Sequence, residues 1–597
     1  MDVRADNSKQ SLRRTFAVLL IGITLGIAMR WVFPAADPPL SRQTGAYWWD
    51  EVWSIGARNG ALFGSWQQDE YNPWTVCPLH TALVQGFLEL FGVNAFGLRF
   101  LAMAGGTLSI ALAFLQTRLL GLSVRAGLMG AFFVATSWTL VGFSRSMTLE
   151  PSIMLFVHLS STLVLLGERS GRFRLAWYAL AGAAGGCAVL CKTSAAVYVL
   201  TMSLFLVAGP LANDGLHRWR WRITRTLVFG VASLAAFGAG FLLWTREWRD
   251  TFVSIAFDTM LYGRAGTTLG MRVYKAVTWA DSQAFLSAPA LIVAVLLVLP
   301  LLVRVARTRL ETVSSIQRFG FWLALINVIL GIAVLINVDV PARRVVYLNL
   351  FLALLAAIAV DWLRQREDDL ANPAPSRVNA LWTVCAFVVA GLVLSGWLVS
   401  PHGGMLSFVN PALASRILFT MQLKIADKAA WLLLGVAIAA ALYRWREALW
   451  QRAGQIVSYA TVAQLALFLI ASGLWIARLS YTVQDASMRI EEITGRESYV
   501  LGGDASALGF NNTTHPLFWT PKAIPYTNVD VDLITQKYDP QYLAISELMW
   551  NEINAGLYGG QPYAQTFQHE VARLPLYEIH ESKDLHGDIL ILKRSPR

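Results

Sequence analysis

The stretch TLVFGVASLAAFGAGFLLW, residues 226–244, contains no charged side chain and decides the fold class. A helix needs about 20 mostly apolar residues to cross the roughly 30 Å hydrocarbon core of a bilayer. Similar runs recur through the first four-fifths of the chain, too often to be the buried helices of a soluble protein. The sequence therefore predicts a polytopic α-helical membrane protein.

The composition agrees with this prediction. Of the 597 residues, 55% are hydrophobic and only 15% are charged, whereas soluble domains carry about 25% charged residues. The net charge of +11 would suggest nucleic-acid binding in a soluble protein. Here the basic residues lie in short loops between apolar runs, so they indicate membrane orientation, and we expect no nucleic-acid partner.

The apolar runs predict about 13 transmembrane helices. They lie at 16–33, 96–116, 126–143, 151–167, 175–190, 194–210, 226–244, 284–303, 319–338, 345–363, 379–399, 429–443 and 458–476. Alternate loops are rich in arginine, as the positive-inside rule expects of cytoplasmic loops. These loops contain Arg169, Arg172, Arg174, Arg218, Arg220, Arg222, Arg225, Arg304, Arg307, Arg309, Arg364, Arg366, Arg444, Arg446 and Arg452. A cytoplasmic N-terminus and 13 spans place all of them inside, whereas 12 spans would break the alternation.

The outward side then carries a long first external loop and the end of the chain. The loop covers 34–95 and contains an apolar stretch, Leu79–Phe91, which predicts a helix at the membrane interface. After residue 484 the chain becomes polar, with strand-like segments at Ser498–Leu501, Tyr542–Ile545 and Ile589–Leu592. We therefore predict a transmembrane domain over 1–484 and an extracytoplasmic soluble α/β domain over 485–597.

Ionisable residues on the outward side are the candidates for chemistry. The acidic candidates are Asp50, Glu51 and Glu150, and the basic candidates are Lys192, Arg264, Arg343 and Arg344. Each of them alone is equally an interfacial charge that reaches water. Ionisable groups at membrane depth are costly, however, and usually face a cavity or a partner. Carboxylates beside cations suit a reaction in which a base activates an acceptor while cations hold a phosphate leaving group.

The order of these features resembles the GT-C glycosyltransferases, in the branch that contains protein O-mannosyltransferases and the bacterial lipid A aminoarabinose transferase. The matching segments, all within 1–360, are Asp50-Glu51, Cys77-Pro78-Leu79-His80, Phe91-Gly92, Leu98-Arg99, Arg145, Leu149-Glu150-Pro151, Cys191-Lys192-Thr193, Arg343-Arg344 and Tyr347. Four positions depart from the family pattern. Val76 and Cys77 replace a basic residue and a proline, Glu150 replaces an aspartate, and Thr193 replaces a glycine.

The resemblance implies a GT-C fold and a glycosyltransferase of hexosyl or pentosyl type. Its donor would be a polyprenyl-phosphate sugar, and its acceptor a lipid, glycan or protein on the extracytoplasmic side of a bacterial inner membrane. Transfer would invert the anomeric carbon. No cofactor is required, although a divalent metal ion would suit the acidic pair.

The same resemblance assigns roles to individual residues. Asp50 would be the base, with Glu51 as the alternative, and Glu150 would position the acceptor or the base. Lys192, Arg264, Arg343, Arg344 and Tyr347 would hold the donor phosphate. His80 and Arg145 would either support the site or pack at the interface.

Two other functions are compatible with a polytopic membrane protein. Transporters and lipid flippases often show internal repeats and broken helices with charges at the membrane midplane. This sequence shows no repeat, and its charges gather at one surface. A non-catalytic scaffold that displays the C-terminal domain would leave the outward acidic and basic residues unexplained.

Overall fold

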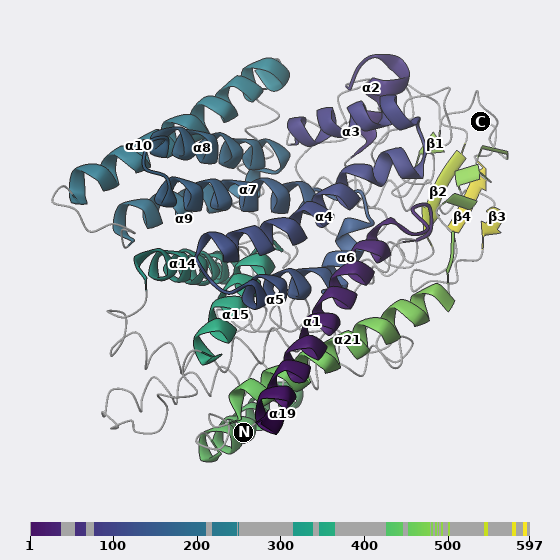
Figure 1. The fold of residues 1–597 in the computed structure, drawn as a ribbon. Coiled ribbons are helices and arrows are strands. Elements are labelled where there is room, and N and C mark those ends of the chain that lie inside the picture. Colours follow the sequence, from purple (N-terminus) through teal and green to yellow (C-terminus); the bar gives the residue numbers. More distant parts are fainter. Residues whose placement is uncertain are drawn as a thin grey trace.

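A computed structural model provides the fold. It describes residues 2–37, 54–66, 77–209, 218–246, 314–337, 346–364, 425–445 and 452–477, isolated positions at 249 and between 479 and 492, and four short strands. Within these residues the chain is mostly helical, and long helices lie side by side in a bundle (Figure 1). Five helices in the described part are long and apolar enough to cross a membrane.

The helices of the bundle follow the predicted apolar runs. They are α1 (Asp2–Trp31), α4 (Ala95–Leu119), α5 (Val124–Ala135), α6 (Trp138–Ser144), α7 (Glu150–Arg169), α8 (Arg174–Cys191), α9 (Ala196–Ala208), α10 (Arg218–Gly240), α14 (Ser315–Asn337), α15 (Leu348–Arg364), α19 (Ile425–Arg444) and α21 (Ala453–Ala477). The predicted spans 284–303 and 379–399 lie outside the described residues. The count of 13 therefore stays a prediction.

One predicted span is interrupted. The run 126–143 was expected to be a single helix, but it forms α5 and the short α6, with a break at Thr136 and Ser137. The Ser137 side chain accepts a hydrogen bond from the backbone N–H of Leu140 and so starts α6. Thr136 receives a 2.7 Å hydrogen bond from Gln464 of α21. Polar side chains therefore satisfy backbone and side-chain groups at this break.

Two predicted boundaries also shift. α10 begins at Arg218 and α8 at Arg174, so Arg174, Arg220, Arg222 and Arg225 are helical residues and do not belong to a connecting loop. A helix can extend past its apolar segment because the side chains of its first turns reach water or partners at the membrane surface. A π-helical turn at Phe241–Thr245 directly follows α10.

Small residues let α8 and α10 pack closely. A Cβ atom added at Gly182 of α8 would lie 2.1 Å from the carbonyl oxygen of Phe229, and one added at Gly186 would lie 2.4 Å from that of Ser233. The Ser233 hydroxyl donates a 2.8 Å hydrogen bond to the Gly182 carbonyl. Small residues with interhelical hydrogen bonds are the usual means of helix association in membranes.

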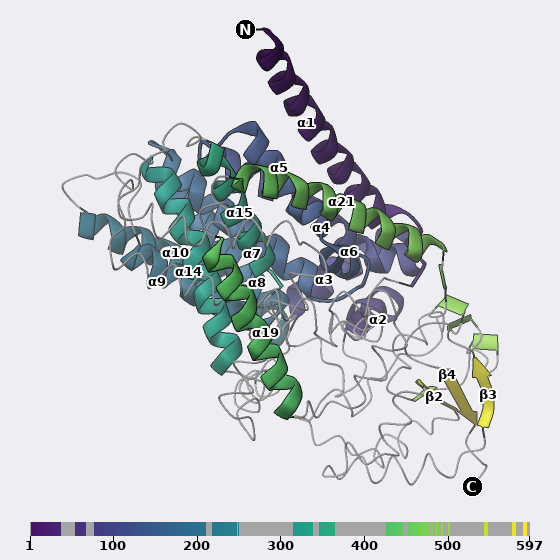
Figure 2. The same ribbon diagram turned by 90° about the horizontal axis from the view of Figure 1, so that it is seen from below.

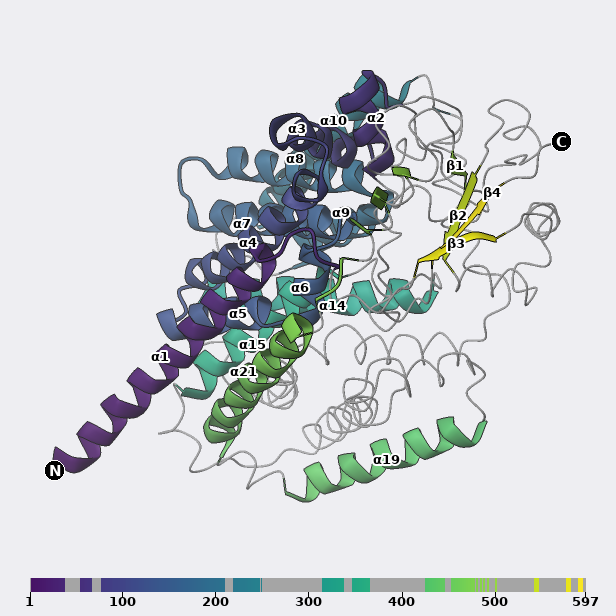
Figure 3. The ribbon, with the colours of Figure 1, turned by 90° about the vertical axis from the view of Figure 1, so that its right-hand side faces the viewer.

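The main apolar core joins α5, α7, α14 and α15. Phe132, Val157, Phe319 and Phe351, one from each of these helices, are completely buried in it. Figures 2 and 3 show α21 lying beside α1 along one side of the bundle.

The segment 34–95, predicted to be an external loop, contains two helices in its described parts. The predicted interfacial helix is present as α3 (Pro78–Phe91). A second helix, α2 (Ile55–Phe63), packs against it and was not predicted. Both lie at the same end of the bundle (Figure 1).

Four strands near the C-terminus form one sheet in the order β1-β2-β4-β3. β1 (Val500–Leu501) pairs in parallel with β2 (Tyr542–Ser546), whereas β4 (Ile589–Lys593) is antiparallel to both β2 and β3 (Leu576–His580). Three strands coincide with predicted segments, and β3 does not. The rest of 485–597 lies largely outside the described residues, so the α/β domain stays a prediction.

Candidate functional site

The candidate site forms where the ends of α3, α7 and α8 meet. α7 begins at Glu150, with Pro151 in its first turn, and α8 ends at Cys191. These two helices are consecutive and antiparallel, so the start of one lies beside the end of the other. α3 packs against α8 near the same end. Side chains from three segments distant in sequence therefore gather at one end of the bundle.

An ion pair between Glu150 and Lys192 is the centre of this site. Lys192 Nζ lies 2.6 Å from Glu150 Oε1, and the two side chains are 15% and 3% exposed. Lys192 adopts an extended backbone conformation that ends α8 before the 3-10 turn Thr193–Ala195. Glu150 is in the first turn of α7, where a carboxylate is stabilised by the helix dipole. The structure thus pairs one predicted acidic residue with one predicted phosphate-binding cation.

His80 lies next to this ion pair. It is fully buried, and its Nδ1 shares a 3.0 Å hydrogen bond with the Ser152 hydroxyl. Burial lowers the pKa of His80 to about 3, while Glu150 acts to raise it and Lys192 to lower it. The imidazole is therefore neutral at ordinary pH. Its Nε2 has no hydrogen-bond partner among the described residues.

Cys77 immediately precedes α3 and is also buried near Lys192. Burial raises the pKa of the Cys77 thiol to about 12, against smaller opposing effects of a hydrogen bond to Thr81 and of the Lys192 charge. The thiolate is the nucleophilic form of cysteine. Cys77 therefore remains a protonated thiol at ordinary pH and contributes packing at this position.

Tyr347 lies deeper in the bundle. Its side chain is 2% exposed, and its ring packs against Tyr198 with the ring centroids 6.3 Å apart. The Tyr347 carbonyl pairs with His158 Nε2 at 2.9 Å. His158 is eight residues beyond Glu150 in α7, a distance of roughly 12 Å at 1.5 Å per residue. The structure therefore places Tyr347 further along α7, away from the Glu150–Lys192 ion pair.

Arg145 fastens α1 to α6 and α21. Its guanidinium donates hydrogen bonds to the carbonyls of Met29 at 2.8 Å, Val32 at 2.5 Å and Phe33 at 2.5 Å. It also lies over the Trp475 ring, 4.4 Å from the ring centroid. These contacts satisfy carbonyls at the end of α1 that the helix itself leaves free.

The chain that follows α21 lies at this same end of the bundle. The Asp37 N–H donates a 2.9 Å hydrogen bond to the Ser480 carbonyl, and Trp475 Nε1 donates to the Asp37 carbonyl at 3.1 Å. Arg145 is only five residues before Glu150. The C-terminal segment therefore starts on the side of the bundle that carries the candidate site.

The other predicted site residues cannot be placed. Asp50, Glu51, Arg264, Arg343 and Arg344 lie outside the described residues, and their roles stay predictions. Within the described part of the chain, no group of three or more histidine, cysteine, aspartate or glutamate residues could hold a metal ion. Ser152 was not predicted, because an uncharged serine in an apolar run carries no signal of its contacts.

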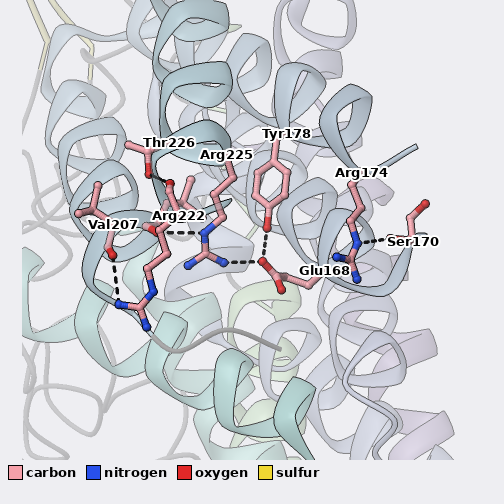
Figure 4. Close-up of polar contacts among 9 residues, drawn as sticks. Glu168, Ser170, Arg174, Tyr178, Val207, Arg222, Arg225 and Thr226 are labelled. Carbon is pink, nitrogen blue, oxygen red and sulfur yellow. Dashed lines mark hydrogen bonds and ion pairs between the residues drawn. The ribbon is translucent and has the colours of Figure 1, made fainter. Parts of the chain in front are cut away.

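A second polar cluster, the Glu168 cluster, lies at the opposite end of α7 (Figure 4). Arg225 Nη1 lies 2.5 Å from Glu168 Oε1, and the Tyr178 hydroxyl donates a hydrogen bond to the same oxygen. Arg225 Nε donates to the Leu206 carbonyl at 2.9 Å. Arg225 is fully buried. The sequence placed this arginine in a cytoplasmic loop, whereas it joins α7, α8, α9 and α10.

Comparison with known families identifies a match to part of the chain. Residues 75–244 match the family described as dolichyl-phosphate-mannose-protein mannosyltransferase. The matched segment runs from α3 to the end of α10 and includes Glu150, Lys192 and His80. No curated protein sequence matches the chain significantly.

Solved structures with a similar fold cover nearly the whole chain. ArnT from Cupriavidus metallidurans bound to undecaprenyl phosphate is 15% identical, with 98% of this chain and 99% of ArnT covered and a TM-score of 0.50. The apo form of the same enzyme is 16% identical, with 99% and 100% covered and a TM-score of 0.50. An Archaeoglobus fulgidus oligosaccharyltransferase is 13% identical over 96% of this chain and 74% of that chain, with a TM-score of 0.46.

The resemblance inferred from the motifs is thereby confirmed. The chain has the GT-C fold of membrane glycosyltransferases and is a multi-pass membrane protein. The family match covers the helices that carry the Glu150–Lys192 pair.

Proposed function

We propose that this protein is an inverting glycosyltransferase that moves a sugar from a polyprenyl-phosphate donor to an acceptor at the outward face of the membrane. The observation that carries the proposal is the Glu150–Lys192 pair, 2.6 Å apart at the meeting point of α3, α7 and α8. It lies within the segment that matches the mannosyltransferase family. ArnT, which has a similar fold, binds undecaprenyl phosphate.

The proposed reaction is a direct displacement at the anomeric carbon. The acceptor oxygen forms a bond to this carbon as the bond to the donor phosphate oxygen breaks, and polyprenyl phosphate leaves. Asp50 takes the acceptor proton, with Glu51 as the alternative base. Cations stabilise the leaving phosphate, and we assign this role to Lys192, Arg264, Arg343 and Arg344.

The described residues contribute positioning and charge to this reaction. Glu150 holds the Lys192 ammonium at the site until the donor phosphate arrives. The neutral imidazole of His80 fixes the start of α3 against Ser152 and leaves Nε2 available to a ligand. We keep Tyr347, which lies deeper in the bundle, as a candidate hydrogen-bond donor to the donor phosphate.

Analysis of lipid-linked sugars and envelope glycans by mass spectrometry tests this function. Cells lacking the gene should lose one glycan and accumulate its lipid-linked donor. The wild-type gene should restore the glycan, as should Arg444→Gln, which changes an exposed arginine in the last turn of α19. Asp50→Asn keeps the size of the side chain but cannot accept the proton, so turnover should fall by a factor on the order of 10².

Two results would contradict the proposal. Unchanged glycans in the deleted cells would exclude the transferase role under those conditions of growth, and full restoration by both Asp50→Asn and Glu51→Gln would exclude the acidic pair as the base. A flippase would give no sugar transfer by the purified protein in detergent. Sidedness is tested separately: Thr308→Cys should resist a membrane-impermeant thiol reagent in intact cells, because we place 304–318 in the cytoplasm.

A further inference from the structure

A basic patch surrounds the Glu168 cluster at the end of the bundle opposite the candidate site. It consists of Arg169, Arg172 and Arg174 around the α7–α8 turn, and Arg220 and Arg222 in the first turns of α10. The two parts touch, since the Arg174 guanidinium lies over the Trp221 ring at 5.6 Å. Figure 4 shows Arg174, Arg222 and Arg225 arranged around Glu168.

The Glu168 carboxylate lies beside the patch but carries too little charge to balance it. Glu168 carries one negative charge and accepts from both Arg225 and Tyr178, whereas the five arginines of the patch carry five positive charges. Two buried guanidinium nitrogens, Arg222 Nε and Arg225 Nη2, have no hydrogen-bond partner among the described residues. Buried donors in folded proteins are normally paired with an acceptor. Positive charge together with unused donors indicates an anionic ligand.

Apolar side chains beside the patch identify the kind of anion. Trp219 is 61% exposed, Phe173 60%, Leu227 59% and Leu175 44%. In a multi-pass membrane protein such side chains face lipid, and tryptophan favours the depth of the headgroups. An occupant that meets both the arginines and this apolar rim has a phosphate head and acyl chains.

We propose that this patch binds the headgroup phosphate of an anionic glycerophospholipid. Arg222 contacts the phosphate from the start of α10, and Arg174 and Arg220 flank it, while Trp219 and Phe173 contact the acyl chains. The site is distinct from the proposed donor site. Glu150 and Glu168 are 18 residues apart in one helix, which is roughly 27 Å at 1.5 Å per residue.

Native mass spectrometry of the purified full-length protein tests the proposal without any measurement of transfer. The protein is titrated with dioleoyl phosphatidylglycerol and, separately, with zwitterionic dioleoyl phosphatidylcholine. Wild-type protein should retain the first lipid in preference to the second. Arg222→Gln should weaken retention of phosphatidylglycerol about fivefold, the effect expected of one arginine at a membrane surface.

Matched variants separate binding from folding and from general charge. Arg220→Gln changes an exposed side chain, so it should weaken lipid retention without altering thermal unfolding. Arg444→Gln removes the same charge from α19 and should leave retention unchanged. Equal retention of the two lipids, or wild-type retention by both Arg222→Gln and Arg220→Gln, would overturn the proposal. So would complete displacement of phosphatidylglycerol by equimolar inorganic phosphate, or by undecaprenyl phosphate.

Discussion

The Glu150–Lys192 pair offers a test in which two substitutions act in opposite directions. Removing one member of a buried ion pair costs about 3–5 kcal/mol, because the other charge stays buried without compensation. Lys192→Met leaves the Glu150 carboxylate only 3% exposed. Since Lys192 itself is 15% exposed, the pair is not fully dry, and we expect a loss of about 2–3 kcal/mol in the free energy of unfolding. Glu150→Gln should cost about 1 kcal/mol or less, because the ammonium can turn toward water.

The same geometry predicts the effect on ligand binding. In Glu150→Gln the Lys192 ammonium no longer has a carboxylate 2.6 Å away, and a negative charge beside the incoming phosphate is gone. Affinity for undecaprenyl phosphate should therefore rise about 5- to 10-fold, which is about 1–1.4 kcal/mol. Lys192→Met removes a charge-assisted bond of about 1.5–3 kcal/mol and should weaken binding about 10- to 100-fold. Turnover should fall in both variants.

Calorimetric titration of the detergent-solubilised protein with undecaprenyl phosphate measures these affinities. Thermal unfolding of the same samples measures the stability change. Lys192→Arg keeps the charge and is the control, with binding closer to wild type than that of Lys192→Met. If Glu150→Gln and Lys192→Met shift the affinity in the same direction, Glu150 does not compete with the ligand for Lys192, and the proposed role of the pair is wrong.

Three further predictions follow from the described contacts. Arg145→Ala removes the hydrogen bonds to the end of α1 and should lower the unfolding free energy by about 3 kcal/mol. The loss is measured as a lower melting temperature and faster proteolysis near α1, and an unchanged melting temperature would refute the stabilising role of Arg145. Gly182→Ala places a Cβ atom 2.1 Å from the Phe229 carbonyl oxygen and should lower the free energy of unfolding by about 2 kcal/mol, measured by thermal unfolding. The control Gly230→Ala, whose Cβ would have no atom within 4 Å, should lower it little, and equal losses would contradict close packing of α8 and α10. The pKa of His80 is lowered from 6.5 to about 3, so between these pH values the folded protein binds fewer protons than the unfolded chain. Stability therefore falls as the pH drops below about 6.5. His80→Gln should lose less stability than wild type between pH 7 and pH 5, and equal losses would show that His80 is not buried as described.

The transmembrane helices were predictable because the bilayer imposes a simple requirement of length and apolarity. The run 96–116 became α4, Ala95–Leu119, almost unchanged. The break between α5 and α6 was not predictable, since Thr136 and Ser137 are uncharged and fit either a continuous or an interrupted helix. What decides between them is the contact of Thr136 with Gln464, more than 300 residues away. Sequence periodicity carries no information on such a partner.

The candidate site was partly predictable for a related reason. Glu150 and Lys192 stood out because charges at apolar helix ends are costly, and antiparallel neighbours bring such ends together. The contact of His80 with Ser152 was not predictable, because it depends on how α3 settles against the helix bundle. The sequence placed Arg225 in a loop, and the structure shows it inside α10. An arginine beside an apolar run suggests a loop, whereas Arg225 is buried within α10 because it contacts the distant Glu168 carboxylate and the Leu206 carbonyl.

The two ion pairs of α7 differ in exposure, and this difference separates their roles. At the Glu168 end of α7 both side chains of the pair are buried, with Arg225 0% and Glu168 4% exposed. Removing Arg225 would take away the cation paired with the buried Glu168 carboxylate, at a cost of about 3–5 kcal/mol, which suits a fixed contact between helices. At the Glu150 end, Lys192 keeps 15% of its side chain exposed. An ammonium that is partly exposed can turn from the carboxylate to an arriving phosphate without becoming a buried unpaired charge, so the exchange of partners that we propose suits Glu150–Lys192 and not Arg225–Glu168.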